Sequence, residues 1–534
     1  MKYGYYLFFA FLTLLTPLVF GGSEPWGLFT FNLSCLCFAF FILFKRQEFV
    51  LTSVSKGIIF LLVTIISLAF LQLLNQHNFL QKPAYLPFTL CKYYSLEGLS
   101  LLFSLAMLYF ALTQVLQQSK EIKKLALIIT INAVITALVS ISFRTEFIQF
   151  FTDIKISSAF GPFTSRNHGA QFVMTAFFIS LLIWLPRFIL AKNNRWSNKN
   201  IWACICSVIL FISVFFAHSR GGVIALILGL FVLCVLCFLY LVRNTKKKIL
   251  HLAVSALIFM ILIHFIITHS TDLGLRDFWT GSDTARLTLY KTALDMLKDF
   301  PFTGVGFDAF SAAIDAYIPF ALKTFPRYLH NDWLELLLSF GYFAGIIIFG
   351  FIGLIIFRIA RNFKGLEIKK QLRVFILCAG LSGFSFTGLV DFPFHLPACA
   401  MLFFFLLAFV SSVSFNLRVT KVHIPFAVKV IFLFLAGVLL LYNFQYVRAW
   451  RNFIFVKQFA PRIQARELSA SVHYYPSPIY IKRALDGKYK MLKSKSTTEE
   501  ERQEIKKDIH RMSAFYLKQY PKDITLSRFF LLTK

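Results

Sequence analysis

Arg327-Tyr-Leu-His-Asn-Asp-Trp-Leu-Glu335 runs directly into a long apolar segment centred near residue 347. A histidine, an asparagine and two carboxylates therefore stand at the water-facing mouth of a segment long enough to cross a bilayer, which takes about 20 mostly apolar residues. About thirteen such segments follow one another along the chain. They centre near residues 12, 35, 66, 107, 134, 179, 209, 232, 258, 347, 382, 404 and 434.

The composition agrees with this pattern. The 534 residues are 58% hydrophobic and only 15% charged, and 67 of them are Phe. No ordinary soluble domain has this balance, so we expect an all-α polytopic membrane protein with about 12–13 transmembrane helices. The nine Cys lie mostly inside apolar runs, which indicates small buried hydrophobic residues rather than a disulfide framework or a metal site.

The excess of Lys and Arg over Asp and Glu, 55 to 25, gives the expected topology. In a soluble protein it would suggest a nucleic-acid partner, but here basic residues in alternate loops explain it, and no nucleic acid is expected. Six such loops fall on one side if every segment spans, and that side should be the cytoplasm. They carry Lys45/Arg46/Lys56, Lys120/Lys123/Lys124, Arg187/Lys192/Arg195/Lys199, Arg243/Lys246/Lys247/Lys248, Arg358/Arg361/Lys364/Lys369/Lys370 and Arg418/Lys421.

The chemically suggestive motifs then share the opposite face. In a bacterial inner membrane this face is the periplasm, where ATP and nucleotide sugars are absent, so a substrate must arrive already activated. We expect a transmembrane domain over 1–443, with a long periplasmic loop at 269–331, and a basic helical region over 444–534. The latter should form short helices near 462–474, 479–490 and 497–520, which could make a single tetratricopeptide-like hairpin. The apolar run near 5–20 is expected to be a retained first span.

Arg220 lies in Phe216-Ala-His-Ser-Arg-Gly-Gly222, between two apolar segments. The two glycines permit a tight turn and close approach of a ligand. An arginine at a membrane boundary often only extends its charge to the interface. The functional interpretation is a fixed guanidinium for a phosphate group.

Arg286 lies in Gly281-Ser-Asp-Thr-Ala-Arg-Leu-Thr-Leu-Tyr-Lys-Thr-Ala-Leu-Asp-Met-Leu297, which has helical spacing of apolar residues at 287, 290, 294 and 297. We expect an amphipathic helix on the outer leaflet or over the bundle, with Arg286 in its first turn. A cation there is disfavoured by the helix dipole unless an anion is bound, although an ordinary solvated arginine is the alternative. The following Pro301-Phe-Thr-Gly-Val-Gly306 predicts a structural turn.

His330 precedes a helix that Asn331 or Asp332 can cap. The positive end of a helix dipole favours a neutral imidazole, which is the form that a general base needs. It also favours an anionic substrate group nearby. The alternative is a hydrogen-bonded interfacial histidine.

Two further clusters of polar residues lie where other predicted spans begin. Arg166-Asn167-His168 follows Gly161, and Asp391 and His395 flank Pro393. Polar side chains at such depth cost several kcal/mol unless they are paired. We interpret Arg166 and Asn167 as possible substrate-binding residues. Asp391 and His395 could instead be structural, or Asp391 could line an acceptor groove.

Taken in order, these pieces resemble the O-antigen ligase/polymerase superfamily of membrane glycosyltransferases. The resemblance covers about residues 155–410. It rests on Gly161 with Asn167, Ser219-Arg220-Gly221-Gly222, Arg286 ahead of Pro301-x-x-Gly304-x-Gly306, and His330-Asn331 with Gly341 downstream. In that family, periplasmic arginines bind the undecaprenyl pyrophosphate of the donor and a histidine is the base. The resemblance assigns these roles to Arg220, Arg286 and His330, while Arg166 has no firm counterpart. Asn331, like Arg166, Asn167 and Asp391, is a candidate substrate-binding residue.

The resemblance implies transfer of a glycan from undecaprenyl pyrophosphate to a lipid A–core sugar. Direct attack opposite the leaving group would invert the anomeric centre. Two arginines can neutralise the leaving pyrophosphate and no Asp-x-Asp stands at a suitable place, so we expect transfer without metal or cofactor. Two alternatives share the donor half of such a site: a polymerase joining lipid-linked repeat units and a protein O-oligosaccharyltransferase. A lipid-linked glycan transporter, which catalyses no reaction, is the alternative from another class.

Overall fold

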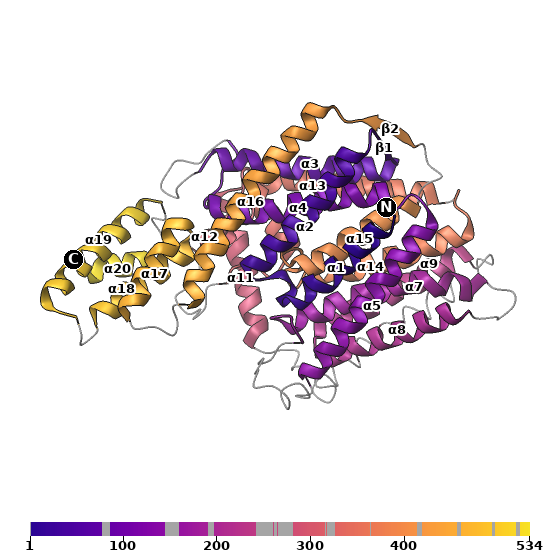
Figure 1. Ribbon diagram of the computed structural model, residues 1–534. Helices are drawn as coiled ribbons and strands as arrows, with labels where there is room; N and C mark the ends of the chain where they lie inside the picture. The colour runs from indigo at the N-terminus through magenta and orange to yellow at the C-terminus, as the bar shows by residue number, and fades with distance from the viewer. Residues whose placement is uncertain are drawn as a thin grey trace.

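The computed structural model describes residues 2–76, 86–144, 160–190, 197–241, 260, 264, 281–314, 317, 326–363, 365–413, 419–455, 461–493, 497–519 and 524–533. Nearly all of its regular structure is helical (Figure 1). The membrane-domain helices are α1 (Lys2–Leu18), α2 (Pro25–Lys45), α3 (Ser53–Leu74), α4 (Lys92–Val115), α5 (Ser119–Arg144), α7 (Arg166–Leu190), α8 (Asn198–Phe216), α9 (Arg220–Leu241), α13 (Asp332–Phe363), α14 (Ile368–Thr387), α15 (Pro397–Val413) and α16 (Phe426–Phe455).

These helices coincide with twelve of the thirteen expected segments, and the segment near 258 lies outside the described residues. Within the described part, nine helices are long and apolar enough to cross a membrane, and α1 and α15 are shorter apolar helices. The predicted all-α polytopic membrane fold is therefore confirmed. All nine cysteines are free thiols.

The bundle has an interior and a lipid-facing layer. In α4 and α7, 72% and 67% of the apolar window is buried, against 17–28% in α3, α8, α9, α13 and α16. α15 is almost wholly buried, packing on α4, α7 and α14. Its 17 residues would be short for a spanning helix, but a helix enclosed by protein need not match the thickness of the lipid.

Basic residues from separate loops meet at one end of the bundle. Strands β1 (Glu48–Leu51) and β2 (Thr420–His423) pair there, and Lys56 Nζ donates to Thr420 Oγ1 at 2.7 Å. Lys429 Nζ donates to the Arg46 carbonyl at 3.1 Å. α7 has Arg187 in its last turn and begins at Arg166, so its 25 residues separate these two arginines by roughly 30 Å.

At the other end, α11 (Gly281–Asp299) and the one-turn α12 (Phe310–Ala313) pack near the start of α13. Leu289, Ala293, Met296 and Leu297 are buried in this contact, whereas Leu287 and Leu294 are exposed. Of the four members of the predicted apolar stripe, Leu297 is buried, Tyr290 is partly buried and the other two are exposed on this helix. Arg286 lies in the second turn of α11, not the first, so the dipole argument for a bound anion loses most of its force.

The turn through Gly304 and Gly306 packs against a kink in α13. Gly341 breaks α13 with φ +76°, which leaves backbone carbonyls free for partners outside the helix. The amides of Val305 and Gly306 donate to the Leu338 and Ser339 carbonyls at 3.0 and 3.3 Å. A Cβ on Gly304 would lie 2.4 Å from the Leu338 carbonyl oxygen, so this Gly-x-Gly is a structural turn, as predicted.

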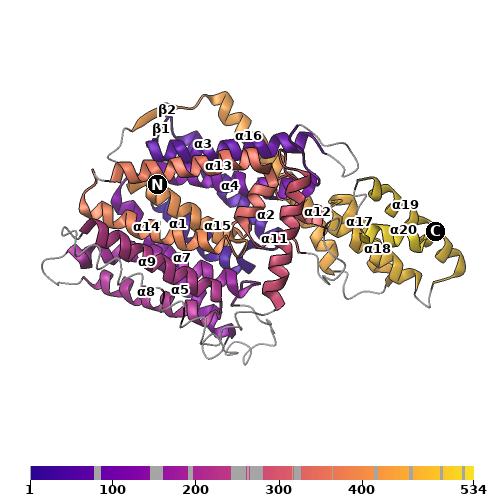
Figure 2. The ribbon, with the colours of Figure 1, turned by 180° about the vertical axis from the view of Figure 1, so that it is seen from behind.

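The C-terminal region projects to one side of the bundle (Figures 1 and 2). It contains α17 (Pro461–Tyr474), α18 (Pro478–Leu492), α19 (Glu499–Gln519) and α20 (Ile524–Leu532). The first three match the expected helices. Residue 444 lies inside α16, which continues to Phe455. The tail is attached through aromatic packing and a hydrogen bond of 2.7 Å from Tyr475 Oη to the Tyr93 carbonyl.

Candidate functional site

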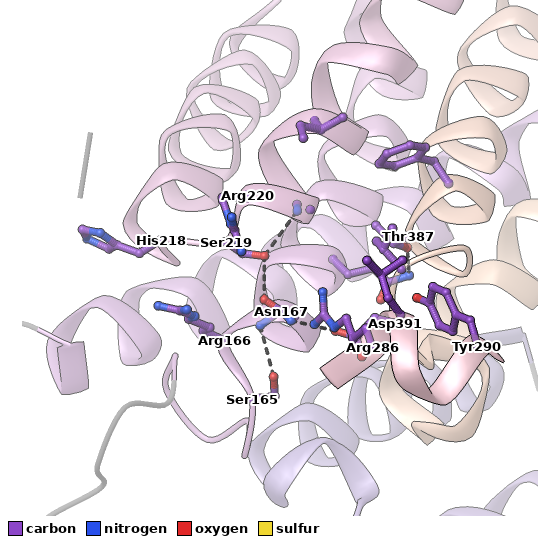
Figure 3. A pocket seen from close by; sticks show the side chains of 17 residues that line it. Ser165, Arg166, Asn167, His218, Ser219, Arg220, Arg286, Tyr290, Thr387 and Asp391 are labelled. Atoms are coloured by element: carbon purple, nitrogen blue, oxygen red, sulfur yellow. Dashed lines mark hydrogen bonds between the residues drawn. The ribbon is translucent and has the colours of Figure 1, made fainter. Parts of the chain in front are cut away.

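A cavity of about 450 Å³ opens where α7 and α9 begin, beside α11 and the end of α14. It brings together five of the predicted site residues: Arg166, Asn167, Arg220, Arg286 and Asp391. Figure 3 shows these side chains arriving from four separate segments. The other lining residues are Ser165, Gln171, His218, Ser219, Gly221, Gly222, Ile224, Leu287, Tyr290, Phe386, Thr387 and Val390.

Close packing places the starts of α7 and α9 side by side. A Cβ on Gly222 would lie 2.6 Å from Ala170 Cβ, so only glycine permits this approach. The turn before α9 is made by His218, whose φ is +51°, and not by the two glycines as the sequence suggested. Ser219 Oγ donates to Asn167 Oδ1 at 2.9 Å, which fixes the two helix starts to each other.

Three arginines line the cavity: Arg166 and Arg220 at the first positions of α7 and α9, and Arg286 on α11 (Figure 3). The N-termini of α7 and α9 also lie at the cavity, and the positive end of a helix dipole favours an anion. Among the described lining residues there is one carboxylate, Asp391, beside the three arginines. Guanidinium groups bind phosphate groups well, so this lining is suited to an anionic group.

His330 lies beside the cavity and is hydrogen-bonded to Asp391, one of the residues that line it. Its Nδ1 lies 3.1 Å from Asp391 Oδ1, and Asp391 Oδ2 accepts from Asn167 Nδ2 at 2.8 Å. The side chain of Asp391 is 6% exposed, whereas that of His330 is 31% exposed. With Nδ1–H donating to the carboxylate, Nε2 is left as the basic nitrogen.

The charge of Asp391 is well stabilised. Burial acts to raise its pKa, but His168, whose Nε2 lies 3.6 Å away, and His330 hold the pKa well below its ordinary value. The amide of Phe392 also donates to Oδ1 at 3.0 Å. Asp391 is therefore ionised at neutral pH and can stabilise an imidazolium on His330.

The backbone around His330 is constrained as well. His330 has φ +58°, in the left-handed region that is uncommon for residues other than glycine. Tyr290 Oη donates to its carbonyl at 2.8 Å. Since Tyr290 is one turn after Arg286 on α11, one helix positions both a cavity arginine and the histidine.

Other predicted residues have structural partners. Asn331 caps α13, accepting from the Leu334 amide at 3.0 Å. Asn167 bridges Ser219 and Asp391. Asp391 lines the cavity, but both of its oxygens are engaged by protein groups.

Sequence reasoning missed several features of this site. It did not pair His330 with Asp391, and it gave no role to Ser219 or Tyr290. Ser219 precedes Arg220, Tyr290 lies one helical turn after Arg286, and Asp391 was itself a candidate. Their expected position on the same face of the membrane was the only available signal. No metal ligands were expected from the sequence. The structure nevertheless places Asp308, Glu335 and His395 in a group whose spacing fits a metal ion.

Residues 205–349 match a family model described as O-Antigen ligase. The matched region contains Arg220, Arg286 and His330, and Arg166 and Asp391 lie outside it. This match confirms the resemblance to the O-antigen ligase/polymerase superfamily. No curated protein matches the chain.

Proposed function

Because residues 205–349 carry the O-antigen ligase family pattern on a polytopic helical bundle, we propose that this membrane enzyme is a glycan ligase. It transfers a glycan from undecaprenyl pyrophosphate to a hydroxyl of a lipid A–core sugar, at the periplasmic face of the bacterial inner membrane. The observation that carries the proposal is that Asp391 belongs to both parts of the site. This one carboxylate lines the arginine cavity and holds His330 at its edge.

The cavity would bind the pyrophosphate of the donor. Arg220 and Arg286 neutralise the charge that develops on the leaving group, Arg166 adds a third cation, and the N-termini of α7 and α9 add the positive ends of their helix dipoles. Each charge-assisted contact is worth about 1.5–3 kcal/mol. Because these groups supply the positive charge, the transfer requires no metal at the pyrophosphate.

His330 would act as general base. Its Nε2 takes the proton of the acceptor hydroxyl while the acceptor oxygen bonds to the anomeric carbon of the donor sugar. The bond from that carbon to the pyrophosphate oxygen breaks, and its electron pair leaves with the pyrophosphate. Attack opposite the leaving group inverts the anomeric centre. Asp391 stabilises the imidazolium that forms.

The decisive variant is His330→Ala, assayed with purified enzyme, lipid-linked glycan and lipid A–core. Transfer should fall by about 10²–10⁴ while binding of the donor persists, because the base acts only in the chemical step. A transporter would depend on the arginines and not on His330. Full transfer by the variant would therefore eliminate this mechanism.

Deletion of the gene identifies the acceptor. Loss of a ligase leaves polymer on undecaprenyl and none on the lipid A–core. Core carrying a single repeat unit would indicate a polymerase, and unchanged lipopolysaccharide with a missing glycoprotein would indicate a protein O-oligosaccharyltransferase.

A further inference from the structure

A second polar cluster is buried close to His330 in the chain, and none of its residues lines the arginine cavity. His395, at the end of the 3-10 helix η3 (Pro393–His395), stands at its centre. Asp332 and Glu335 come from the first turn of α13, and Asp308 comes from the turn after Gly306. The ligand atoms of Asp308, Glu335 and His395 all lie within 4.8 Å of one another.

The geometry around His395 is typical of a metal-binding histidine. Its Nδ1 lies 2.9 Å from Asp332 Oδ1, an arrangement that fixes the ring and leaves Nε2 to coordinate. Nε2 is 3.5 Å from Asp308 Oδ1 and 3.7 Å from Glu335 Oε1, which is long for hydrogen bonds. Two ligands at about 2.1 Å from a tetrahedral ion stand about 3.4 Å apart, close to these separations.

Glu335 supplies an independent indication. Its side chain is 4% exposed, and its Oε2 accepts from the Leu329 amide at 2.9 Å. Its Oε1, directed at Asp308 and His395, has no hydrogen-bond partner among the described residues. A buried carboxylate oxygen without a partner is costly, and a cation would remove that cost.

The local charge points the same way. Arg327 binds Asp308 through two hydrogen bonds of 3.3 and 3.0 Å, and its Nη2 lies 3.6 Å from Glu97 Oε2. Asp332 and Glu335 then face His395 without a second arginine among the described residues. Arg327 thus compensates Asp308, whereas the positive charge beside Asp332 and Glu335 must come either from His395 itself or from a bound cation.

We propose that Asp308, Glu335 and His395 bind a divalent metal ion, with Asp332 as the positioning residue that orients His395. One imidazole with two carboxylates suits Zn²⁺ or Mn²⁺ better than Mg²⁺ or Ca²⁺. The ion joins η3, the start of α13 and the turn at Asp308. It braces the two segments that carry His330 and Asp391 and is no reactant in the transfer.

The test uses the full-length protein in detergent, stripped with a chelator and titrated with Zn²⁺ and, separately, Mn²⁺. Metal content and melting temperature are measured. The wild type should bind one ion per chain with a rise in Tm. Glu335→Gln should lose the ion yet fold, because the amide oxygen can still accept from Leu329 while its NH₂ faces Asp308. Asp332→Asn should weaken affinity about 10–100-fold.

His423→Gln, which changes an exposed histidine on β2, is the matched control and should bind as the wild type does. Equal binding by Glu335→Gln would show an adventitious ion and overturn the proposal. So would a wild type that neither binds metal nor changes in Tm, which would leave His395 as an imidazolium among carboxylates. Neither readout depends on transfer, and His330→Ala should keep the ion, so this inference and the proposed function fail separately.

Discussion

His330 and Asp391 face each other across 61 residues of sequence, with Nδ1 and Oδ1 3.1 Å apart. A reciprocal pair lies next to them: Asp332 Oδ1 is 2.9 Å from His395 Nδ1. The segment at the start of α13 and the segment before α15 thus each contribute one histidine and one aspartate to the two pairs. A general base held in this way keeps its tautomer and its direction without help from substrate.

Asp391→Asn should lower transfer by about 10²–10⁴, because the amide cannot stabilise the imidazolium. Asp295→Asn, an exposed change on α11, is the control and should leave the rate of transfer unchanged. Full transfer by Asp391→Asn would contradict the pairing.

The effect of Asp391→Asn on the stability of the folded protein should depend on pH in a defined way. The pKa of Asp391 is lower in the folded than in the unfolded protein, so its contribution is complete above the unfolded value of about 3.9 and is lost only as pH falls through the lower folded value. The loss of Tm in Asp391→Asn should therefore be alike at about pH 6 and about pH 8. Thermal unfolding at both values checks this.

Substitution of the cavity arginines should lower the rate of transfer far more than substitution of an arginine at the basic end of the bundle. Arg220→Ala and Arg286→Ala should each lower kcat by about 10²–10³, since their contacts strengthen as the leaving group gains charge. Lysine at either position should restore part of the rate but not the fork geometry. Arg187→Ala, at the far end of α7, should have little effect. Equal losses in all three alanine variants would indicate a general effect of charge.

Tyr290→Phe should lower kcat several-fold without weakening donor binding. The hydroxyl holds the His330 carbonyl and touches no proposed reacting atom, so its loss loosens the base alone. Steady-state kinetics with varied donor concentration measure this, and a change confined to KM would count against the assignment.

Gly222→Ala should separate the starts of α7 and α9. The added Cβ would stand 2.6 Å from Ala170 Cβ, and such overpacking costs about 1–3 kcal/mol. We expect a lower Tm and weaker donor binding. Gly353→Ala is the matched control, because nothing lies within 4 Å of that position on α13, and it should be neutral or stabilising.

The membrane architecture could be predicted because apolar segments of spanning length and basic loops are local signals. Arg220 and His330 could be proposed from the sequence because each stands at the end of such a segment, and Arg286 because it lies near the start of an amphipathic helix. Which side of α11 packs on the protein could not be predicted from the spacing of its apolar residues, because the helix also exposes leucines such as Leu287 and Leu294. The pairing of His330 with Asp391 depends on how two loops meet in space, and neither spacing nor composition carries that information.

The exchange of histidine and aspartate between the two segments bears on how this site can change during evolution. A substitution at Asp391 leaves His330 without its partner, and a substitution at His395 does the same to Asp332. Neither segment can therefore change its sequence alone without loss of activity. Among related sequences, residues 330 and 332 should therefore covary with 391 and 395, and grafting one segment from a distant relative should succeed only when the other is grafted with it.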